Sequence, residues 1–300
     1  MAKFCTNCGA KLEGDYEFCT ECGSNLNAPA KPNGVIIRNF VGENDNIKVI
    51  DEKGPFKVIE YEKDLSVSPS EVMYKYFASK MNVRPRQLVV DLRKTSGIYL
   101  QSGAMQWMSG SSKLSTGIKS VADFGKKFLK STVTNETTVK PEYSGNGYVI
   151  TEQTYKHLIL LDLDDWGNNL MIDDGLFLAA EKSVELSVKR RTNLSSAFAS
   201  SEGFFNTVLH GKGYICLESR IPLKELIIIE LNNDTVSIDG PMAIAWTSNL
   251  ELTVERSAKS FVGSAVSGEG LVNVYRGTGK ILMAPLTGNL KLRDMPKSDK

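Results

Sequence analysis

A Gly-x-Gly motif followed by an apolar run occurs three times in the sequence at a constant spacing of 66 residues. The copies begin at Gly145, Gly211 and Gly277. The same spacing holds between the motifs, because 172–188 and 238–254 are identical at six of seventeen positions. Chance would give about one identity over such a stretch. The chain therefore repeats one structural unit, and any fold must place equivalent segments in equivalent environments.

A first copy of the unit is present with insertions. Val89 to Leu92 resembles Leu160 to Leu163, and Gly103 falls near the position of Gly175. We therefore expect three units that span about 86–150, 155–218 and 223–286.

Alternating side chains identify these units as β structure. Val184, Leu186 and Val188 point to one face of a strand while the polar residues between them point to the other. The runs His157–Leu161 and Leu226–Ile229 are apolar on both faces, so we expect them to lie between two layers. The fold class is all-β, with three similar β-sandwich or β-roll units. Because such a unit cannot cover its own edges, we expect the units to stack side by side in one domain.

The Gly-x-Gly motifs raise the question of phosphate binding. They lack the GxGxxG continuation and a following helix, and each leads into a β-type run. We therefore expect them to be hairpin turns.

Four of the five cysteines are clustered near the N-terminus as two Cys-x2-Cys pairs, Cys5 with Cys8 and Cys19 with Cys22. This spacing lets two thiolates from one tight turn reach a tetrahedral ion at about 2.3 Å. A glycine follows each pair and tolerates the positive φ that closes the turn. Four thiolates favour one structural Zn²⁺ per chain, with a rubredoxin-type iron site, disulfides or free thiols as alternatives.

Residues 1–26 resemble the short zinc ribbons found at the N-termini of many bacterial proteins, with the four cysteines on the ligand positions. The segment is too short to bury a core, so we expect it to fold only with metal. Acidic residues dominate its surface, which disfavours phosphate binding and favours a protein partner. They are Glu13, Asp15, Glu17 and Glu21.

The remaining segments divide the chain further. Residues 27–34 are rich in proline and asparagine and are predicted to be a linker, and 287–300 form a polar tail. Between the linker and the repeats, 35–85 should hold further strands and one helix. Ser68 as capping residue, Pro69 at the first helical position and Glu71 at the third predict a short helix over 69–81. We expect its apolar stripe to pack on the body of the domain, with a partner-binding helix as the alternative.

Charge and hydropathy limit the possible partners. Thirty-six basic and thirty-five acidic residues leave a net charge of +1, so no global field recruits nucleic acid or an anionic membrane. No apolar run approaches the roughly 20 residues of a membrane helix, and the first ten residues lack a signal-peptide core. We expect a cytoplasmic protein without a transmembrane segment. One local basic loop carries Lys113, Lys119, Lys126, Lys127 and Lys130.

Several segments together resemble the AIM24 family over about 56–286. These segments are Gln101–Met108, Asp174–Ala179, Glu202–Phe205, Gly211–Gly213 and Gly268–Val272. The resemblance implies a fold similar to the tryptophan-RNA-binding attenuation protein (TRAP-like), with three units per chain and three chains closing into a homotrimeric ring of nine units. It implies no settled biochemical activity.

No catalytic constellation stands out in the sequence. His157 and His210 are the two histidines, and we interpret both as structural. Asp162, Asp164, Asp165, Asp173 and Asp174 resemble a calcium cluster, but Trp166 occupies a ligand position of an EF-hand loop, so we favour turn roles. Cys216 is expected to be a core thiol. Trp107 and Trp246 are expected in the core, with a subunit interface as the alternative.

These features together predict a non-enzymatic AIM24-like binding or scaffold protein with a structural zinc ribbon. We expect it to assemble as a trimeric ring for protein–protein or membrane-associated interaction. The alternative is an RNA-binding protein that uses the ring or the Lys113–Lys130 loop, although the charge balance disfavours nucleic acid.

Overall fold

The computed structural model describes residues 3–4, 10–12, 14, 17–23, 35–116, 140–173, 175–190, 205–239, 242–256 and 271–285. The chain divides into two compact parts, Met1–Ile37 and Arg38–Lys300, and the three repeat units lie in the second part, called the body below. The smaller part contains an antiparallel pair of short strands, β1 (Lys3–Phe4) and β2 (Lys11–Leu12). The predicted linker at 27–34 and the tail at 287–300 lie outside the described residues.

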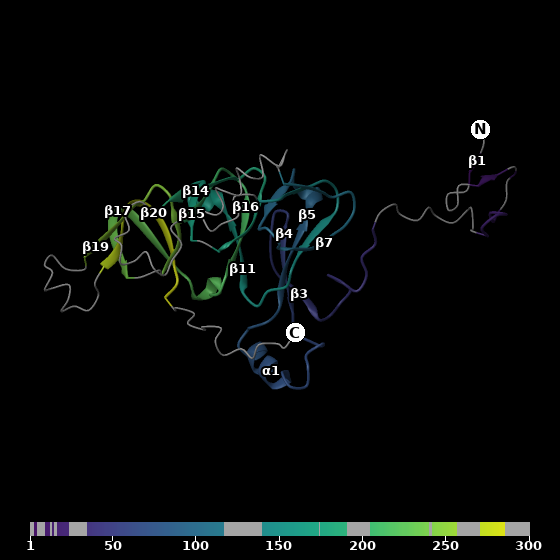
Figure 1. Cartoon of the computed structure of the whole chain (residues 1–300), viewed down its shortest axis with the longest axis horizontal. Helices are drawn as coiled ribbons and strands as arrows, with labels where there is room; N and C mark the ends of the chain where they lie inside the picture. The colour runs from purple at the N-terminus through teal and green to yellow at the C-terminus, as the bar shows by residue number, and fades with distance from the viewer. Residues whose placement is uncertain are drawn as a thin grey trace, which may run out of the picture. The chain divides into compact units, whose positions relative to one another are not determined.

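Three antiparallel sheets build the body (Figure 1). The first has the order β3-β4-β5-β10-β7. Its strands are β3 (Ile47–Lys53), β4 (Phe56–Tyr61), β5 (Arg86–Asp91), β10 (Tyr148–Thr151) and β7 (Met105–Met108). The second has the order β11-β16-β13-β6-β9-β8. Its strands are β11 (His157–Asp162), β16 (Tyr214–Ser219), β13 (Phe177–Glu181), β6 (Ile98–Leu100), β9 (Glu142–Ser144) and β8 (Lys113–Ser115).

The third sheet has the order β14-β15-β12-β18-β20-β17, and β19 also pairs with β20. Its strands are β14 (Glu185–Arg190), β15 (Phe205–His210), β12 (Asn169–Ile172), β18 (Ala243–Thr247), β20 (Leu271–Met283), β17 (Ile227–Asp239) and β19 (Glu251–Arg256). Short 3₁₀ helices η1 (Leu92–Lys94), η2 (Leu163–Trp166) and η3 (Leu223–Glu225) join some of the strands.

The sequence repeat is also a repeat of topology. The second unit places β11-β16-β13 in one sheet and β14-β15-β12 in the next. The first unit does the same with β5-β10-β7 and β6-β9-β8. In the third unit β17 and β20 are long enough to serve both layers. In the first two units the two layers therefore belong to different sheets, whereas all strands of the third unit belong to the third sheet.

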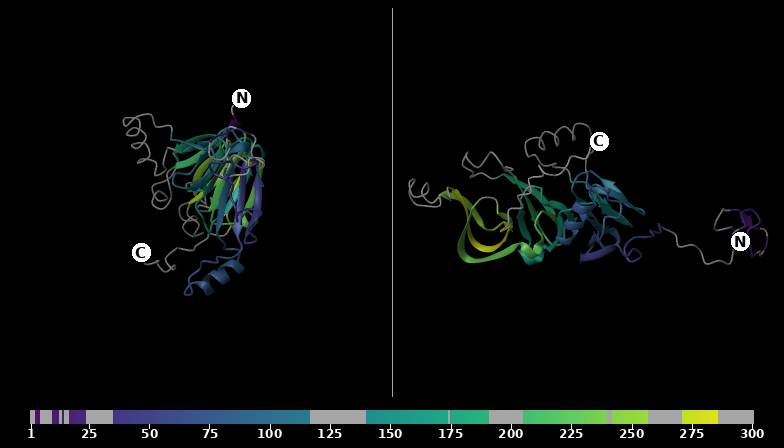
Figure 2. Two further views of the ribbon diagram at one scale, coloured as in Figure 1. Left: turned by 90° about the vertical axis from the view of Figure 1, so that its right-hand side faces the viewer. Right: turned by 90° about the horizontal axis from the view of Figure 1, so that it is seen from below.

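Neighbouring units are joined edge to edge. The first unit meets the second through β6 and β13, and the second meets the third through β12 and β18. Both junctions are antiparallel, with Tyr99 opposite Ala180 in one and Met171 opposite Trp246 in the other. In Figure 2 the first and third units lie at opposite ends of the sheets, with the second between them.

A β-bulge occurs at the same place in every unit. The register of β10 with β7 shifts after Ile150 opposite Trp107, that of β16 with β13 after Cys216 opposite Ala179, and that of β20 with β18 after Leu282 opposite Ala245. Because bulges set strand curvature, their recurrence gives the three sandwiches the same bend. It also aligns the units residue by residue, so that Met108, Ala180 and Trp246 are equivalent.

The Gly-x-Gly motifs are not hairpin turns, and that prediction is wrong. The strands before and after Gly145 and Gly211 belong to different sheets, and Gly277 lies inside the continuous strand β20. The motif is the bend at which the chain crosses between layers. Its first glycine has the same positive φ in every copy, 114°, 109° and 120°. A side chain at the second glycine, Gly147, would overlap the carbonyl oxygen of Ser109, so glycine is required there.

Apolar clusters fill the units, and a further cluster of Ile47, Ile59, Val89 and Ile150 lies on the first sheet. The core of the second unit includes Leu161, Leu170 and Ile215, and separate clusters fill the first and third units. The prediction that His157–Leu161 lies between layers is confirmed, because Leu158 to Leu161 are buried. The same prediction is wrong for Leu226–Ile229, since Ile227 and Ile228 are exposed. Within this chain the third unit has no further unit stacked against it.

The predicted helix is present as α1 (Val72–Lys80). It begins three residues later than Pro69 because Ser68, Pro69 and Ser70 form a turn in which the Glu71 N–H donates to the Ser68 carbonyl. The Ser68 hydroxyl donates to the Glu71 carboxylate, 3.2 Å away, and does not cap the helix backbone. The expectation that the helix packs its apolar stripe on the body is wrong, because none of its residues is buried.

Candidate functional sites

The second cysteine pair of the ribbon forms a closed turn. The Gly23 N–H donates to the Cys19 carbonyl at 2.8 Å, and Gly23 has a φ of 69°, as expected for the glycine that follows a metal-binding pair. Cys19 is buried and Cys22 is exposed. Cys5 and Cys8 lie outside the described residues. The turn from Cys19 to Gly23 has the form expected of one half of a four-thiolate Zn²⁺ site.

The two histidines lie in unrelated places. His157 begins β11, and His210 ends β15 on the exposed surface. Burial and the nearby Arg86 guanidinium lower the pKa of His157 from 6.5 to about 4. A histidine of this kind stays neutral at physiological pH and is poorly suited to accept a proton.

Among the aspartates of the second unit, Asp162 bonds the backbone and Asp164 lies 3.8 Å from the Lys212 ammonium. The Asp162 carboxylate accepts a hydrogen bond from the Asp164 N–H at 3.0 Å and caps η2. Asp91, its equivalent in the first unit, accepts from the Arg93 N–H in the same way and caps η1. Trp166 is buried, and Asp174 lies outside the described residues. This capping supports the turn role predicted for Asp162.

The remaining predicted residues divide between core and surface. Cys216 is fully buried, and burial raises the pKa of its thiol, so it is a core residue as predicted. Trp246 is in the core, whereas Trp107 is only partly covered and contacts Phe40 edge to face at 5.8 Å. Of the predicted basic loop only Lys113 is described. Lys119, Lys126, Lys127 and Lys130 lie outside the described residues.

The first sheet ends in an open edge at β7. Among the described strands, β7 pairs only with β10. Its equivalents β13 and β18 each pair on both sides, because the preceding unit supplies a neighbour. Met108 on this edge is 40% exposed, although its equivalents Ala180 and Trp246 are buried. The backbone of β7 therefore lacks the neighbour that the other two units have.

A complementary edge lies at the other end of the body. The second half of β17, from Asp234 to Asp239, pairs with β20 and has no second partner among the described strands. Its equivalents β6 and β12 pair with the next unit. Ser237 occupies the position of Met171, 66 residues earlier, which lies opposite Trp246. The third unit thus presents in β17 the kind of strand that β7 of the first unit lacks as a neighbour.

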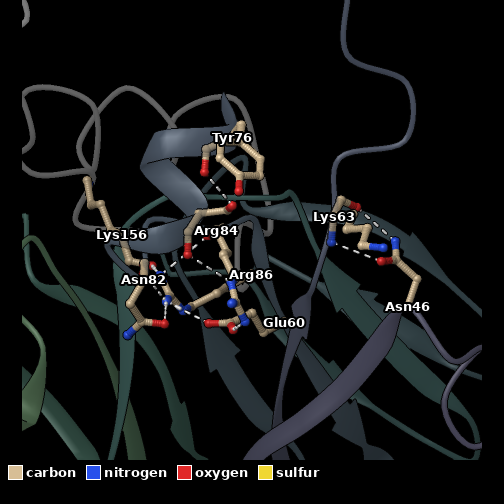
Figure 3. A network of polar contacts seen from close by, with 9 residues as sticks. Asn46, Glu60, Lys63, Tyr76, Asn82, Arg84, Arg86 and Lys156 are labelled. Atoms are coloured by element: carbon tan, nitrogen blue, oxygen red, sulfur yellow. Dashed lines mark hydrogen bonds and ion pairs between the residues drawn. The ribbon is translucent and has the colours of Figure 1, made fainter. Parts of the chain in front are cut away.

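A buried polar network lies at the base of α1 (Figure 3). The Glu60 carboxylate contacts Arg86 at 2.6 Å and Arg84 at 3.0 Å, and Arg86 is almost completely buried. Arg86 also donates to the Asn82 carbonyl at 2.7 Å, and Arg84 donates to the Ser79 carbonyl at 3.3 Å. These bonds tie the end of α1 to β4 and β5.

Family comparison assigns most of the chain. The model for mitochondrial biogenesis AIM24 matches residues 80–286, and the zinc-ribbon domain model matches 4–26. The chain belongs to the AIM24 family. This AIM24 chain is similar to an uncharacterised protein of Streptococcus pyogenes serotype M6, with 25% identity over 221 residues that cover 70% of this chain and 86% of that protein.

The chain is also similar to one solved structure. The X-ray structure of a Streptococcus pyogenes protein matches with a TM-score of 0.49 at 22% identity, over 68% of this chain and 89% of that chain. In the described part of this AIM24 protein, no helix is long and apolar enough to cross a membrane.

Proposed function

We propose that this AIM24 protein is a non-enzymatic cytoplasmic scaffold that assembles head to tail into a homotrimeric ring. Its zinc ribbon is tethered to the ring and recruits a protein partner. The described residues include no activated nucleophile beside a base, and the His157 imidazole is held neutral by its surroundings.

The observation that carries the proposal is the complementarity of the two open edges. Within one chain, β6 of the first unit pairs with β13 of the second, and β12 of the second unit pairs with β18 of the third. The same rule applied between copies pairs β17 of one chain with β7 of another. The register then follows, with Ser237 opposite Met108 and Ile238 opposite Trp107. A head-to-tail contact that closes by rotation removes every such edge from the assembly.

Exposed apolar side chains at the ends of the chain support the same contact. Ile227 is 43% exposed, while Ile159, its equivalent in the second unit, is 3% exposed and covered by the third unit. A neighbouring copy would cover Ile227 in the same way. Closure after three copies is what the resemblance to the AIM24 family implies.

The ribbon is proposed to hold one Zn²⁺ through Cys5, Cys8, Cys19 and Cys22. A metal with four thiolate ligands has no open position for water or substrate, so its contribution is to fold the ribbon. Acidic residues around the cysteines, such as Glu17 and Glu21, favour a basic protein surface as the partner.

Mass measurement of the full zinc-loaded chain by light scattering tests the assembly. The expected mass is three times the 33.0 kDa chain. The double variant Met108→Glu/Ser237→Glu places like charges opposite each other across the junction and should give monomers. The matched variant Met108→Lys/Ser237→Glu should restore the trimer. A wild-type monomer at micromolar concentration, or equal behaviour of the two variants, would overturn the proposal.

A further inference from the structure

We propose that the outward face of α1 inserts into the surface of a phospholipid bilayer. The basis is that α1 turns small and polar residues towards the body and large apolar residues outward.

The side of α1 that faces the body is small or polar. Lys75, Ala78 and Ser79 are the partly covered residues of the helix, and the others are exposed. The Lys75 ammonium pairs with the Asp64 carboxylate at 3.3 Å and contacts the Tyr155 hydroxyl and ring. An ordinary surface helix buries its apolar stripe, whereas this helix exposes its apolar residues and turns Lys75 towards the body.

The outward side is apolar. Met73 and Phe77 are one helical turn apart on the outward face, and they are 70% and 60% exposed. Leu65 before the helix and Met81 after it are more exposed still. Large apolar side chains exposed along and beside one helix of an isolated chain indicate an interaction site.

The residues around this apolar surface favour a bilayer over a protein groove. Tyr74 and Tyr76 flank Phe77, and the Lys80 ammonium lies 5.1 Å above the Tyr76 ring. Tyrosine rings favour the membrane–water interface, and a lysine stem can lie along apolar chains while its ammonium reaches a headgroup phosphate. Apolar side chains at the centre with tyrosine and lysine around them are the pattern of interfacial helices.

The helix projects from the body and is held firmly, as insertion requires. In Figure 1 α1 lies below the sheets and clear of them. The network of Glu60, Arg84 and Arg86 anchors its C-terminal end, and the contact of Lys75 with Asp64 anchors its middle. A projecting ridge fits a deformable lipid surface without needing a matching groove.

A second, smaller exposed apolar group lies where the second unit meets the third, at the same end of the strands as α1. Thr154 pairs with Arg86 beside α1. Two residues later, the Lys156 ammonium pairs with the Glu218 carboxylate of β16 at 2.8 Å, and η3 follows β16 in the chain. Leu223 in η3 is exposed between the exposed cations Arg220 and Lys224. Both junctions therefore expose an apolar side chain beside a cation, and the second also exposes the Glu225 carboxylate.

The proposed ring would present three copies of α1, and this part of the inference rests on the proposed assembly. Rotation about one axis puts the same rim of every copy on the same side, so three α1 helices would meet one bilayer together. Three weak insertions on one rigid body bind far more tightly than one.

Vesicle flotation with the full zinc-loaded protein tests the proposal. Two compositions are used, phosphatidylcholine alone and phosphatidylcholine with phosphatidylglycerol. Wild-type protein should float with the vesicles, with tighter binding to the anionic mixture. Phe77→Glu should weaken partitioning about tenfold or more, because it removes a buried aromatic side chain and adds a charge. The matched control Ile50→Glu, at a similarly exposed apolar residue of β3, should bind like wild type.

The outcomes separate this proposal from the assembly. Phe77→Glu should remain a trimer by light scattering, whereas Met108→Glu/Ser237→Glu should be monomeric and should bind vesicles more weakly with α1 intact. Absence of wild-type binding to both vesicle types, or equal binding of Phe77→Glu and wild type, refutes the membrane role. A trimer with no vesicle binding would indicate that α1 docks on protein instead.

Discussion

Met108 in β7 and Trp246 in β18 occupy the same position in the first and third units, yet Met108 is 40% exposed and Trp246 is 1% exposed. The difference comes from the neighbouring strand. β18 lies beside β12, whereas β7 has no second partner among the described strands. The position is thus an interior site in one unit and an edge site in another, and it defines where a second copy should join.

The register of that junction can be tested by cross-linking. Cysteines at Met108 and Ser237 should form a disulfide between copies under mild oxidation, because the alignment of units places the two residues opposite each other. Non-reducing electrophoresis measures the product. The control pair Met108→Cys/Thr235→Cys is displaced by two residues and should cross-link much less. Equal yields for the two pairs would show that the register is wrong.

Metal binding is expected to belong to the ribbon alone. Elemental analysis should find about one zinc per chain. Cys19→Ser should abolish binding, because three thiolates hold the ion much less firmly than four, while the β body stays folded by circular dichroism and keeps its mass. Retention of zinc by Cys19→Ser would place the metal elsewhere.

The buried pair of Glu60 and Arg86 should contribute strongly to stability. Glu60→Gln leaves the Arg86 guanidinium buried without a counter-charge, and we expect a loss of about 3 kcal/mol in the free energy of unfolding. Glu52→Gln removes an exposed carboxylate that pairs with Lys94 at 3.0 Å and should cost less than about 1 kcal/mol. Urea titration compares the two. Similar losses would mean that burial of Arg86 is not the deciding factor.

The second glycine of each bend is expected to tolerate no side chain. Gly147→Ala would drive a methyl group into the Ser109 carbonyl, and we expect a loss of about 3 kcal/mol from overpacking. Gly103→Ala meets no atom within 4 Å and has only its positive φ of 78° to oppose it, so about 1 kcal/mol is expected. Thermal unfolding measures both, and the reverse order would contradict the bend geometry.

Acid should destabilise the protein through His157. Its folded pKa of about 4 is below the 6.5 of a free histidine, so above pH 6.5 the neutral form is present in both states and the full stability is retained. As pH falls from 6.5 towards 4, the unfolded chain binds a proton that the folded chain does not, and stability decreases. His157→Gln should lose less melting temperature between pH 7 and pH 4.5 than wild type. His210→Gln, at an exposed position, is the control, and an equal benefit from both would exclude His157 as the cause.

Much of the fold could be predicted from the sequence because the chain repeats one structural unit three times. Period-two alternation identifies strands, and the 66-residue spacing identifies equivalent strands such as β14 and β19. The role of Gly211 could not be predicted. A positive φ is a local property, and it is the same whether the next strand returns to its predecessor or enters another sheet.

The candidate surfaces were harder to predict for a related reason. Periodicity shows that Met73 and Phe77 share a face of α1, but it does not show which face the body covers. Lys75 faces the body because its ammonium pairs with the Asp64 carboxylate and contacts the Tyr155 hydroxyl. Likewise Ile227 has an apolar sequence environment, yet its cover must come from a neighbouring unit that one chain does not supply.

The continuous strand β20 has a consequence for how the protein is made. β17 and β19 find their strand partner in β20, which is the last described strand of the chain. During synthesis, the strand that should join a second copy has nothing to pair with until residues 271–283 have left the ribosome. In the proposed ring, a chain that stops early would therefore lack a paired joining strand and could not close the assembly.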